Sequence, residues 1–172
     1  MSTTSIELVP GDAAEFVIPD ADAMEALGAR LAAVVRAGDL VLLNGDLGAG
    51  KTTLTRGLGA ALGARGAITS PTFVLARTHP TASGVPLVHV DAYRLGSAAE
   101  VHDLDLDLEG SITVVEWGAG KLDGAVDAWL ELDIERPHGG DPEADDAPRH
   151  VRLTAYGERW AGVTIELPPT AR

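Results

Sequence analysis

Residues 45–52 read Gly-Asp-Leu-Gly-Ala-Gly-Lys-Thr and fit the phosphate-binding pattern G-x-x-x-x-G-K-[ST] without deviation. Glycines allow such a loop to turn successive backbone N–H groups toward phosphate oxygens. Lys51 is the residue that would reach the β and γ phosphates, and the hydroxyl of Thr52 would bind Mg²⁺. The alternative is a glycine-rich turn that binds nothing. The pattern favours a nucleoside triphosphate site.

The segments on both sides of this loop have the character that a P-loop requires. Residues 39–44 are rich in leucine and predict a short buried strand that runs into the loop. Residues 52–62 predict a helix with a leucine at every fourth position, and Gly63 supplies its end. The start of this helix adds unpaired N–H groups and the positive end of its dipole to the phosphate site.

Two carboxylates stand at the ends of other apolar segments. Asp91 closes residues 87–91, and Glu116 closes residues 112–116. In an open α/β sheet the ligand lies beyond the carboxyl ends of the strands, so either carboxylate could face the Mg²⁺ bound at Thr52. Each of them also fits an ordinary helix cap or turn, and the sequence does not say which would touch the metal directly.

Three other residues have both a functional and a structural interpretation. Thr72, in a Ser-Pro-Thr segment after the P-loop helix, could contact the γ-phosphate as a switch residue does, or belong to an ordinary turn. His89 lies on an apolar strand, where a histidine is more often a hydrogen-bonded core residue than a catalyst. Trp117 could stack on a base or pack in the core.

The composition restricts the classes of function. The chain has 172 residues, of which 45% are hydrophobic, enough for one domain with a sizeable core. The absence of cysteine excludes disulfides, thiolate metal sites and cysteine catalysis. A net charge of −13 argues against a nucleic-acid surface of its own, although a protein partner could hold RNA. No signal peptide or membrane span of roughly 20 apolar residues is evident, so we expect a cytoplasmic protein without membrane contact.

The order of elements predicts an α/β fold, with a P-loop NTPase-like, mostly parallel sheet flanked by helices and antiparallel strands toward the C-terminus. We expect a single domain over 1–172, with a strand or extension in 1–18 and an acidic loop at 137–148. The other predicted elements are strands at 5–9, 73–78, 129–135, 150–155 and 163–167, a helix from Asp20 to about Ala37, and a short helix at 98–104.

Four blocks of this sequence resemble the bacterial TsaE (YjeE) family, in the family's order and spacing. They are residues 45–53, Ser70–Phe73, His89–Leu95 and Glu116–Gly118. The resemblance extends from about residue 19 to residue 155. It implies an ATPase of tRNA threonylcarbamoyladenosine synthesis that is weak alone and is stimulated in a complex with TsaD and TsaB. That pair modifies the adenosine beside the anticodon, so tRNA would be contacted only indirectly, and the isolated protein is expected to be a monomer.

The resemblance also assigns roles by position. It makes Asp91, Glu116 and Thr72 the catalytic residues, with Asp91 orienting water or the metal shell, and it places Mg²⁺ at Thr52 and Glu116. It assigns the following residues to ATP: Ala21, Gly45, Asp46, Leu47, Gly48, Ala49, Gly50, Lys51, Thr52, Thr53, Trp117 and Arg149.

Two other functions fit a P-loop chain of this size. A small-molecule or nucleoside kinase should have an arginine-rich lid, but the chain after the P-loop helix offers only Arg65 and Arg77, and then Arg94. A nucleotide-gated binding module would use ATP to order a docking surface without hydrolysis. Because no arginine finger is evident, we expect any ATP hydrolysis by the isolated protein to be slow.

Overall fold

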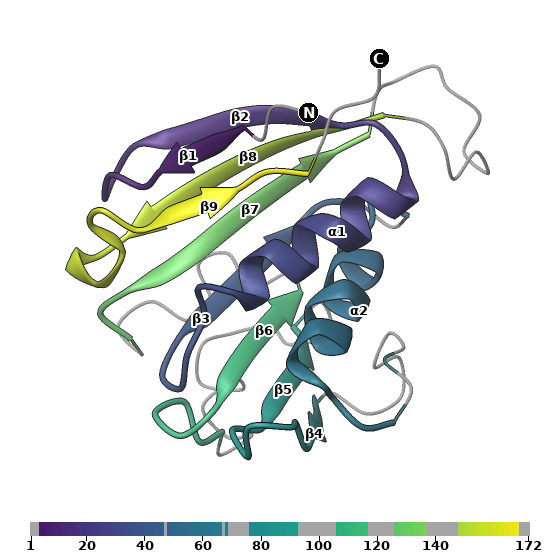
Figure 1. Cartoon of the computed structure of the whole chain (residues 1–172), viewed down its shortest axis with the longest axis vertical. Helices are drawn as coiled ribbons and strands as arrows, with labels where there is room; N and C mark the ends of the chain where they lie inside the picture. The colour runs from purple at the N-terminus through teal and green to yellow at the C-terminus, as the bar shows by residue number, and fades with distance from the viewer. Residues whose placement is uncertain are drawn as a thin grey trace.

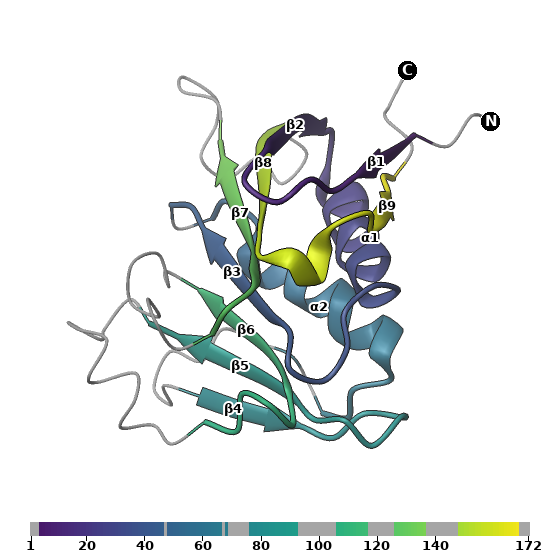
Figure 2. The ribbon, with the colours of Figure 1, turned by 90° about the vertical axis from the view of Figure 1, so that its left-hand side faces the viewer.

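The computed structural model describes residues 4–46, 48–66, 68, 76–92, 106–116, 126–136 and 148–168. Within them, the main sheet has seven strands in the spatial order β2 (Ala13–Ile18), β8 (Arg149–Tyr156), β7 (Trp129–Glu135), β3 (Leu40–Asn44), β6 (Ile112–Glu116), β5 (Leu87–Asp91) and β4 (Ala76–His79). Two helices, α1 (Ala21–Ala32) and α2 (Lys51–Leu62), lie against one face of this sheet (Figures 1 and 2).

The centre of the sheet is parallel and its outer parts are antiparallel. Strands β7, β3, β6 and β5 run in the same direction. Strand β4 runs antiparallel to β5, and β8 runs antiparallel to both of its neighbours, β7 and β2. This confirms the predicted α/β fold. Because the four central strands are parallel, their carboxyl ends lie at the same edge, where the P-loop also begins.

A second, two-stranded sheet joins the two ends of the chain. Strand β1 (Ser5–Glu7) pairs antiparallel with β9 (Thr164–Glu166), which follows a short 3-10 helix, η1 (Glu158–Trp160). The predicted strands at 5–9 and 163–167 are therefore present, in shorter form, but they pair with each other outside the main sheet.

The core has one layer on each face of the sheet. Leu43 of β3 packs toward the helices with Leu27 of α1 and Leu54 of α2. Leu42, one residue earlier, belongs to a second cluster that includes Val115 of β6. Successive side chains of a strand point to opposite faces, so β3 is buried on both sides, which explains its uninterrupted apolar sequence.

Helices α1 and α2 touch through their backbones. A Cβ atom on Gly28 of α1 would overlap the backbone carbonyl oxygen of Leu54, and one on Gly57 of α2 would overlap that of Glu25. No larger residue fits these two positions unless the helices separate. The contact anchors α2, and with it the end of the P-loop, against α1.

The first helix is shorter than the sequence predicts. The Asp20 side chain accepts a hydrogen bond from the Ala23 N–H at 2.8 Å, as expected of the N-cap, but the helix ends at Ala32 and the prediction of an end near Ala37 is wrong. The next segment forms turns instead. The Asp39 carboxylate accepts the Arg36 N–H at 2.8 Å, and Arg159 donates to the Val34 carbonyl at 2.8 Å. The local bond from Asp39 and the long-range bond from Arg159 both compete with helical hydrogen bonds.

Other boundaries agree closely with the sequence. Strands β5 and β7 match the expected ranges, β6 closes at Glu116 as expected, and β8 extends the expected range by one residue at each end. Strand β2 was not predicted separately from the N-terminal extension. Residues 73–75, the short helix at 98–104 and residues 137–147 of the acidic loop lie outside the described residues. Within the described part, no helix is long and apolar enough to cross a membrane.

Candidate nucleotide site

The glycine-rich loop lies between β3 and α2, as the sequence predicts. Its backbone needs glycine at two positions in particular: Gly50 has φ = 117°, and Gly45 has φ = 156°. A Cβ on Gly45 would also come 2.5 Å from the carbonyl oxygen of Ile134 in β7. The Ala49 N–H donates to the Asp46 carbonyl at 3.0 Å and closes a turn inside the loop. Leu47 lies outside the described residues.

The start of α2 suits an anion. Gly50 is the N-cap and has no side chain that could cap the helix, and the first turn contains no acidic residue. The first N–H groups of a helix lack intrahelical partners, and the dipole makes this end positive. Thr52 and Thr53 lie half-buried in this first turn. The arrangement is the one that binds phosphate groups in P-loop proteins.

Lys51 is a buried cation held against the loop. Its Nζ donates to the carbonyl oxygens of Gly45 at 2.6 Å and Asp46 at 3.0 Å. Burial lowers the pKa of Lys51 below the usual 10.5, and the negative charges of Glu116, Asp46 and Asp91 oppose this effect. An ammonium group with little solvent and several nearby carboxylates is in a position to exchange its carbonyl partners for phosphate oxygens.

Both predicted carboxylates lie on the helix side of the sheet. Asp91 and Glu116 are register partners at the ends of β5 and β6. Leu87 and Val114, an even number of residues earlier on the same strands, belong to the core beneath the helices, so the two carboxylates share that face. Glu116 is buried and Asp91 is half-buried. The structure thus brings both residues to the charge environment of Lys51.

Glu116 also contacts a residue that the sequence assigned to the core. Nε2 of His89 lies 2.7 Å from Oε2 of Glu116, and His89 is fully buried. The prediction of a hydrogen-bonded histidine is confirmed, but its partner is the candidate metal carboxylate. The sequence contained an indication of this contact. His89 and Asp91 lie two residues apart on a strand, so their side chains point to the same face.

Arg149, at the start of β8, reaches the P-loop from a distant part of the chain. Its Nε donates to the Ala49 carbonyl at 3.0 Å and its Nη2 donates to the Gly48 carbonyl at 3.2 Å. Arg136, directly after β7, places Nη1 3.5 Å from the position that a Cβ on Gly48 would occupy. Sequence reasoning did not single out Arg136, because only the sheet brings the end of β7 beside the loop.

The first turn of α1 packs against the start of α2. The Met24 side chain comes within 3.2 Å of the position that a Cβ on Gly50 would take. Ala21 is the first residue of α1 and so lies at the same end of the helix pair as the loop. Thr72 and Trp117 lie outside the described residues, and their assignments stay predictions.

Residues that could hold Mg²⁺ lie at the start of α2 and on the facing strand. Among the described residues no group of three or more His, Asp or Glu is arranged to hold a metal ion. Mg²⁺ needs few protein ligands when it is bound together with phosphates and water. A threonine hydroxyl at the helix start, with a buried carboxylate on the facing strand, satisfies that requirement.

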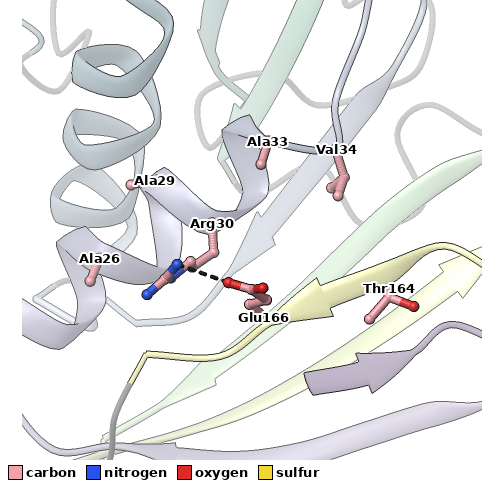
Figure 3. A pocket seen from close by; sticks show the side chains of 7 residues that line it. All are labelled: Ala26, Ala29, Arg30, Ala33, Val34, Thr164 and Glu166. Carbon is pink, nitrogen blue, oxygen red and sulfur yellow. Dashed lines mark hydrogen bonds and ion pairs between the residues drawn. The ribbon is translucent and has the colours of Figure 1, made fainter. Parts of the chain in front are cut away.

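A separate cavity lies between α1 and β9. It has a volume of about 480 Å³ and is lined partly by Ala26, Ala29 and Ala33 of α1 (Figure 3). Arg30 Nη1 and Glu166 Oε2 form an ion pair at 3.0 Å beside it, with both side chains largely exposed. None of its lining residues belongs to the P-loop, and such an exposed pair contributes little to stability. This cavity is not the nucleotide site.

Comparison with known proteins decides the family. The model of the family described as "Threonylcarbamoyl adenosine biosynthesis protein TsaE" matches residues 18–141. The chain belongs to the TsaE family. The TsaE protein of Streptomyces coelicolor is 57% identical over 148 residues, which cover 84% of this chain and 98% of that protein. The TsaE protein of Bacillus subtilis is 34% identical over 83% of this chain and 86% of its own length.

The fold agrees with this assignment to the TsaE family. The crystal structure of Bacillus subtilis YdiB superimposes with a TM-score of 0.66 and 28% identity, and the match covers 87% of this chain and 89% of that one. The segment that matches the TsaE model contains the P-loop, Asp91 and Glu116, whereas Arg149 lies beyond it.

Proposed function

We propose that this protein is a Mg²⁺-dependent ATPase that serves the threonylcarbamoyl modification of tRNA adenosine next to the anticodon. Membership of the TsaE family supports the pathway. The observation that supports hydrolysis is that Asp91 and Glu116, which are register partners, act electrostatically on the buried Lys51 at the start of α2. A phosphate-binding loop alone binds a nucleotide. The added carboxylates supply what hydrolysis needs.

The residues divide the work as follows in this proposal. The backbone N–H groups of the loop and of the α2 start bind the phosphates, with Arg149 holding the loop in shape, and Lys51 places its charge at the β and γ phosphates. Thr52 and Glu116 hold Mg²⁺, which neutralises charge on the phosphates. Asp91 accepts a hydrogen bond from the attacking water and aims it at the γ phosphorus, so that ADP and phosphate are released.

Partners complete the proposal. The protein is a monomer with a single domain over 1–172. It hydrolyses ATP slowly alone and faster in a complex with TsaD and TsaB. A net charge of −13 suits a cytoplasmic protein that leaves tRNA to its partners.

The experiment is phosphate release from Mg²⁺–ATP by the protein alone and then with TsaD, TsaB and tRNA. We expect weak release that rises in the complex and is lost in Asp91→Asn. Asp133→Asn is the matched control, because Asp133 lies on another strand of the same sheet, β7, and on the opposite face, where it accepts a hydrogen bond from Asn44 at 3.0 Å. If the partners produce no rise, the proposed role is wrong, and a phosphorylated small-molecule acceptor would point to a kinase.

A further inference from the structure

The contact between His89 and Glu116 indicates a role for this histidine that the proposed function does not include. His89 is fully buried in the middle of β5, and Glu116 is only 4% exposed. An ionised carboxylate only accepts hydrogen bonds, so Nε2 of His89 must carry the hydrogen in the 2.7 Å contact with Oε2. The carboxylate is therefore held by a donor that comes from the neighbouring strand.

The stability of the sheet does not explain this histidine. The other residues of the strand interior, Leu87, Val88 and Val90, are apolar and buried. An imidazole among them loses its hydration, and within the described structure only Nε2 recovers a partner, while Nδ1 has none. A leucine would fill the position without leaving a buried polar atom unbonded. A residue that a stable core would avoid points to a role at the site.

The position of the pair shows which role. Both side chains lie on the helix side of the sheet, and the Glu116 charge acts on Lys51 at the start of α2. A glutamate has three side-chain torsions, so a carboxylate at a strand end can take several orientations. A hydrogen bond to one oxygen removes most of them and fixes the direction of the other oxygen.

We propose that His89 is a positioning residue that orients the Glu116 carboxylate toward the Mg²⁺ of the nucleotide complex. The inference rests on the proposed function, because it assumes that Glu116 lies beside the metal. Groups that orient a metal-side ligand in this way typically change metal affinity by about 10–100-fold when they are removed.

The test compares two amides at position 89. In His89→Gln the side-chain N–H₂ reaches about as far as Nε2 and keeps the donor, whereas the shorter side chain of His89→Asn cannot reach Glu116. We would titrate Mn²⁺ into protein saturated with ADP and follow free Mn²⁺ by electron paramagnetic resonance. His89→Asn should weaken Mn²⁺ binding about 10–100-fold. His89→Gln should retain most of the affinity, and ADP affinity without metal should be unchanged in both.

Two controls separate positioning from a structural effect. His79→Asn changes another buried histidine, on β4, which contacts the Arg65 carbonyl and should not alter Mn²⁺ affinity. In a Glu116→Gln background, His89→Asn should have no further effect on Mn²⁺ binding, because the group that it orients has lost its charge. His89→Leu takes the place of His89→Asn if the latter does not fold.

The outcomes distinguish this inference from the proposed function. A folded His89→Asn or His89→Leu protein with wild-type Mn²⁺ affinity overturns the inference, and so does an equal loss in His89→Gln. Weaker ADP binding without metal would show a general structural role and would overturn it as well. If the wild-type protein with ADP does not bind Mn²⁺ at all, the proposed ATPase site itself is wrong.

Discussion

Asp91 and Glu116 stand side by side at the carboxyl ends of two parallel strands, β5 and β6, and their charges act on the same buried cation, Lys51. Glu116 is in turn the register partner of Leu43 in β3, the strand that leads into the P-loop. The sheet therefore sets the distance between the carboxylates and the lysine of the P-loop.

Substitution of the two carboxylates should have different effects on metal binding. Glu116→Gln should weaken Mn²⁺ binding to the ADP complex by about tenfold or more, because it removes charge beside the metal. Asp91→Asn should bind Mn²⁺ and nucleotide normally but lose about 100-fold or more in turnover, because it removes the group that orients water. The paramagnetic titration and a phosphate-release assay measure the two effects. A reversed pattern would exchange the two assignments.

Lys51 should make stability depend on alkaline pH. Its pKa in the folded protein lies below the usual 10.5, so between those two values the unfolded chain binds more protons than the folded chain. The free energy of unfolding should therefore rise with pH through that window and be insensitive to Lys51 below it. Lys51→Met lacks this contribution. Urea unfolding of both proteins is measured from neutral pH upward, without nucleotide. The free energy of unfolding of the wild type should increase with pH relative to that of the variant. Parallel curves would contradict the lowered pKa.

The close contact between α1 and α2 should make alanine at Gly28 or Gly57 destabilising. Alanine is intrinsically favoured over glycine inside a helix by roughly 0.5–1 kcal/mol. At Gly28 or Gly57, however, the added Cβ would overlap a backbone carbonyl of the other helix, and overpacking costs about 1–3 kcal/mol or more. We expect a net loss of stability in urea unfolding, together with weaker nucleotide binding as α2 shifts. Arg56→Ala, at an exposed position of α2, is the control and should be near neutral. A stabilised Gly28→Ala protein would refute the close contact.

Arg149 should be needed for the shape of the loop. Its guanidinium binds the carbonyls of Gly48 and Ala49 through two different nitrogens, which a lysine cannot reproduce. Hydrogen bonds from a charged donor contribute about 1.5–3 kcal/mol each, so both Arg149→Ala and Arg149→Lys should weaken ADP binding by about tenfold or more. Titration with a fluorescent ADP analogue measures this. Arg152→Ala is the control, because Arg152 lies on the exposed face of β8, with Glu15 3.8 Å away. Equal effects of the two alanine variants would indicate that ADP binding is weakened by the loss of positive charge and not by the loss of contacts to the loop carbonyls.

Local patterns in the sequence were sufficient for several elements. The P-loop, the leucine spacing of α2 with Gly63 at its end, and the Asp20 cap are each specified within a few residues of chain, and the structure contains all three. The alternation in residues 129–135 likewise marked β7 at its observed bounds. Short-range information is enough where backbone hydrogen bonding and helical or strand periodicity are themselves short-range.

Other features depended on contacts between distant residues. The predicted end of α1 is too late, because Arg159, which donates to Asp39 and to the Val34 carbonyl in the turn after the helix, comes from a distant part of the chain. The approach of Arg136 to Gly48 had no local signal. Strand β9 was expected, but its pairing with β1 could not be derived, since pairing is set by which edges remain free after the main sheet has formed.

The sequence by itself determined that a glycine-rich loop with the P-loop pattern joins a buried strand to a helix and that two carboxylates end apolar strands. Only the tertiary structure decided that those strands lie next to each other in register, that Nε2 of His89 lies 2.7 Å from Glu116, and that Arg149 reaches the loop carbonyls. The physical reason is that residue types fix local conformation, whereas side-chain distances across a sheet depend on strand order and register, which the packing of the whole chain selects.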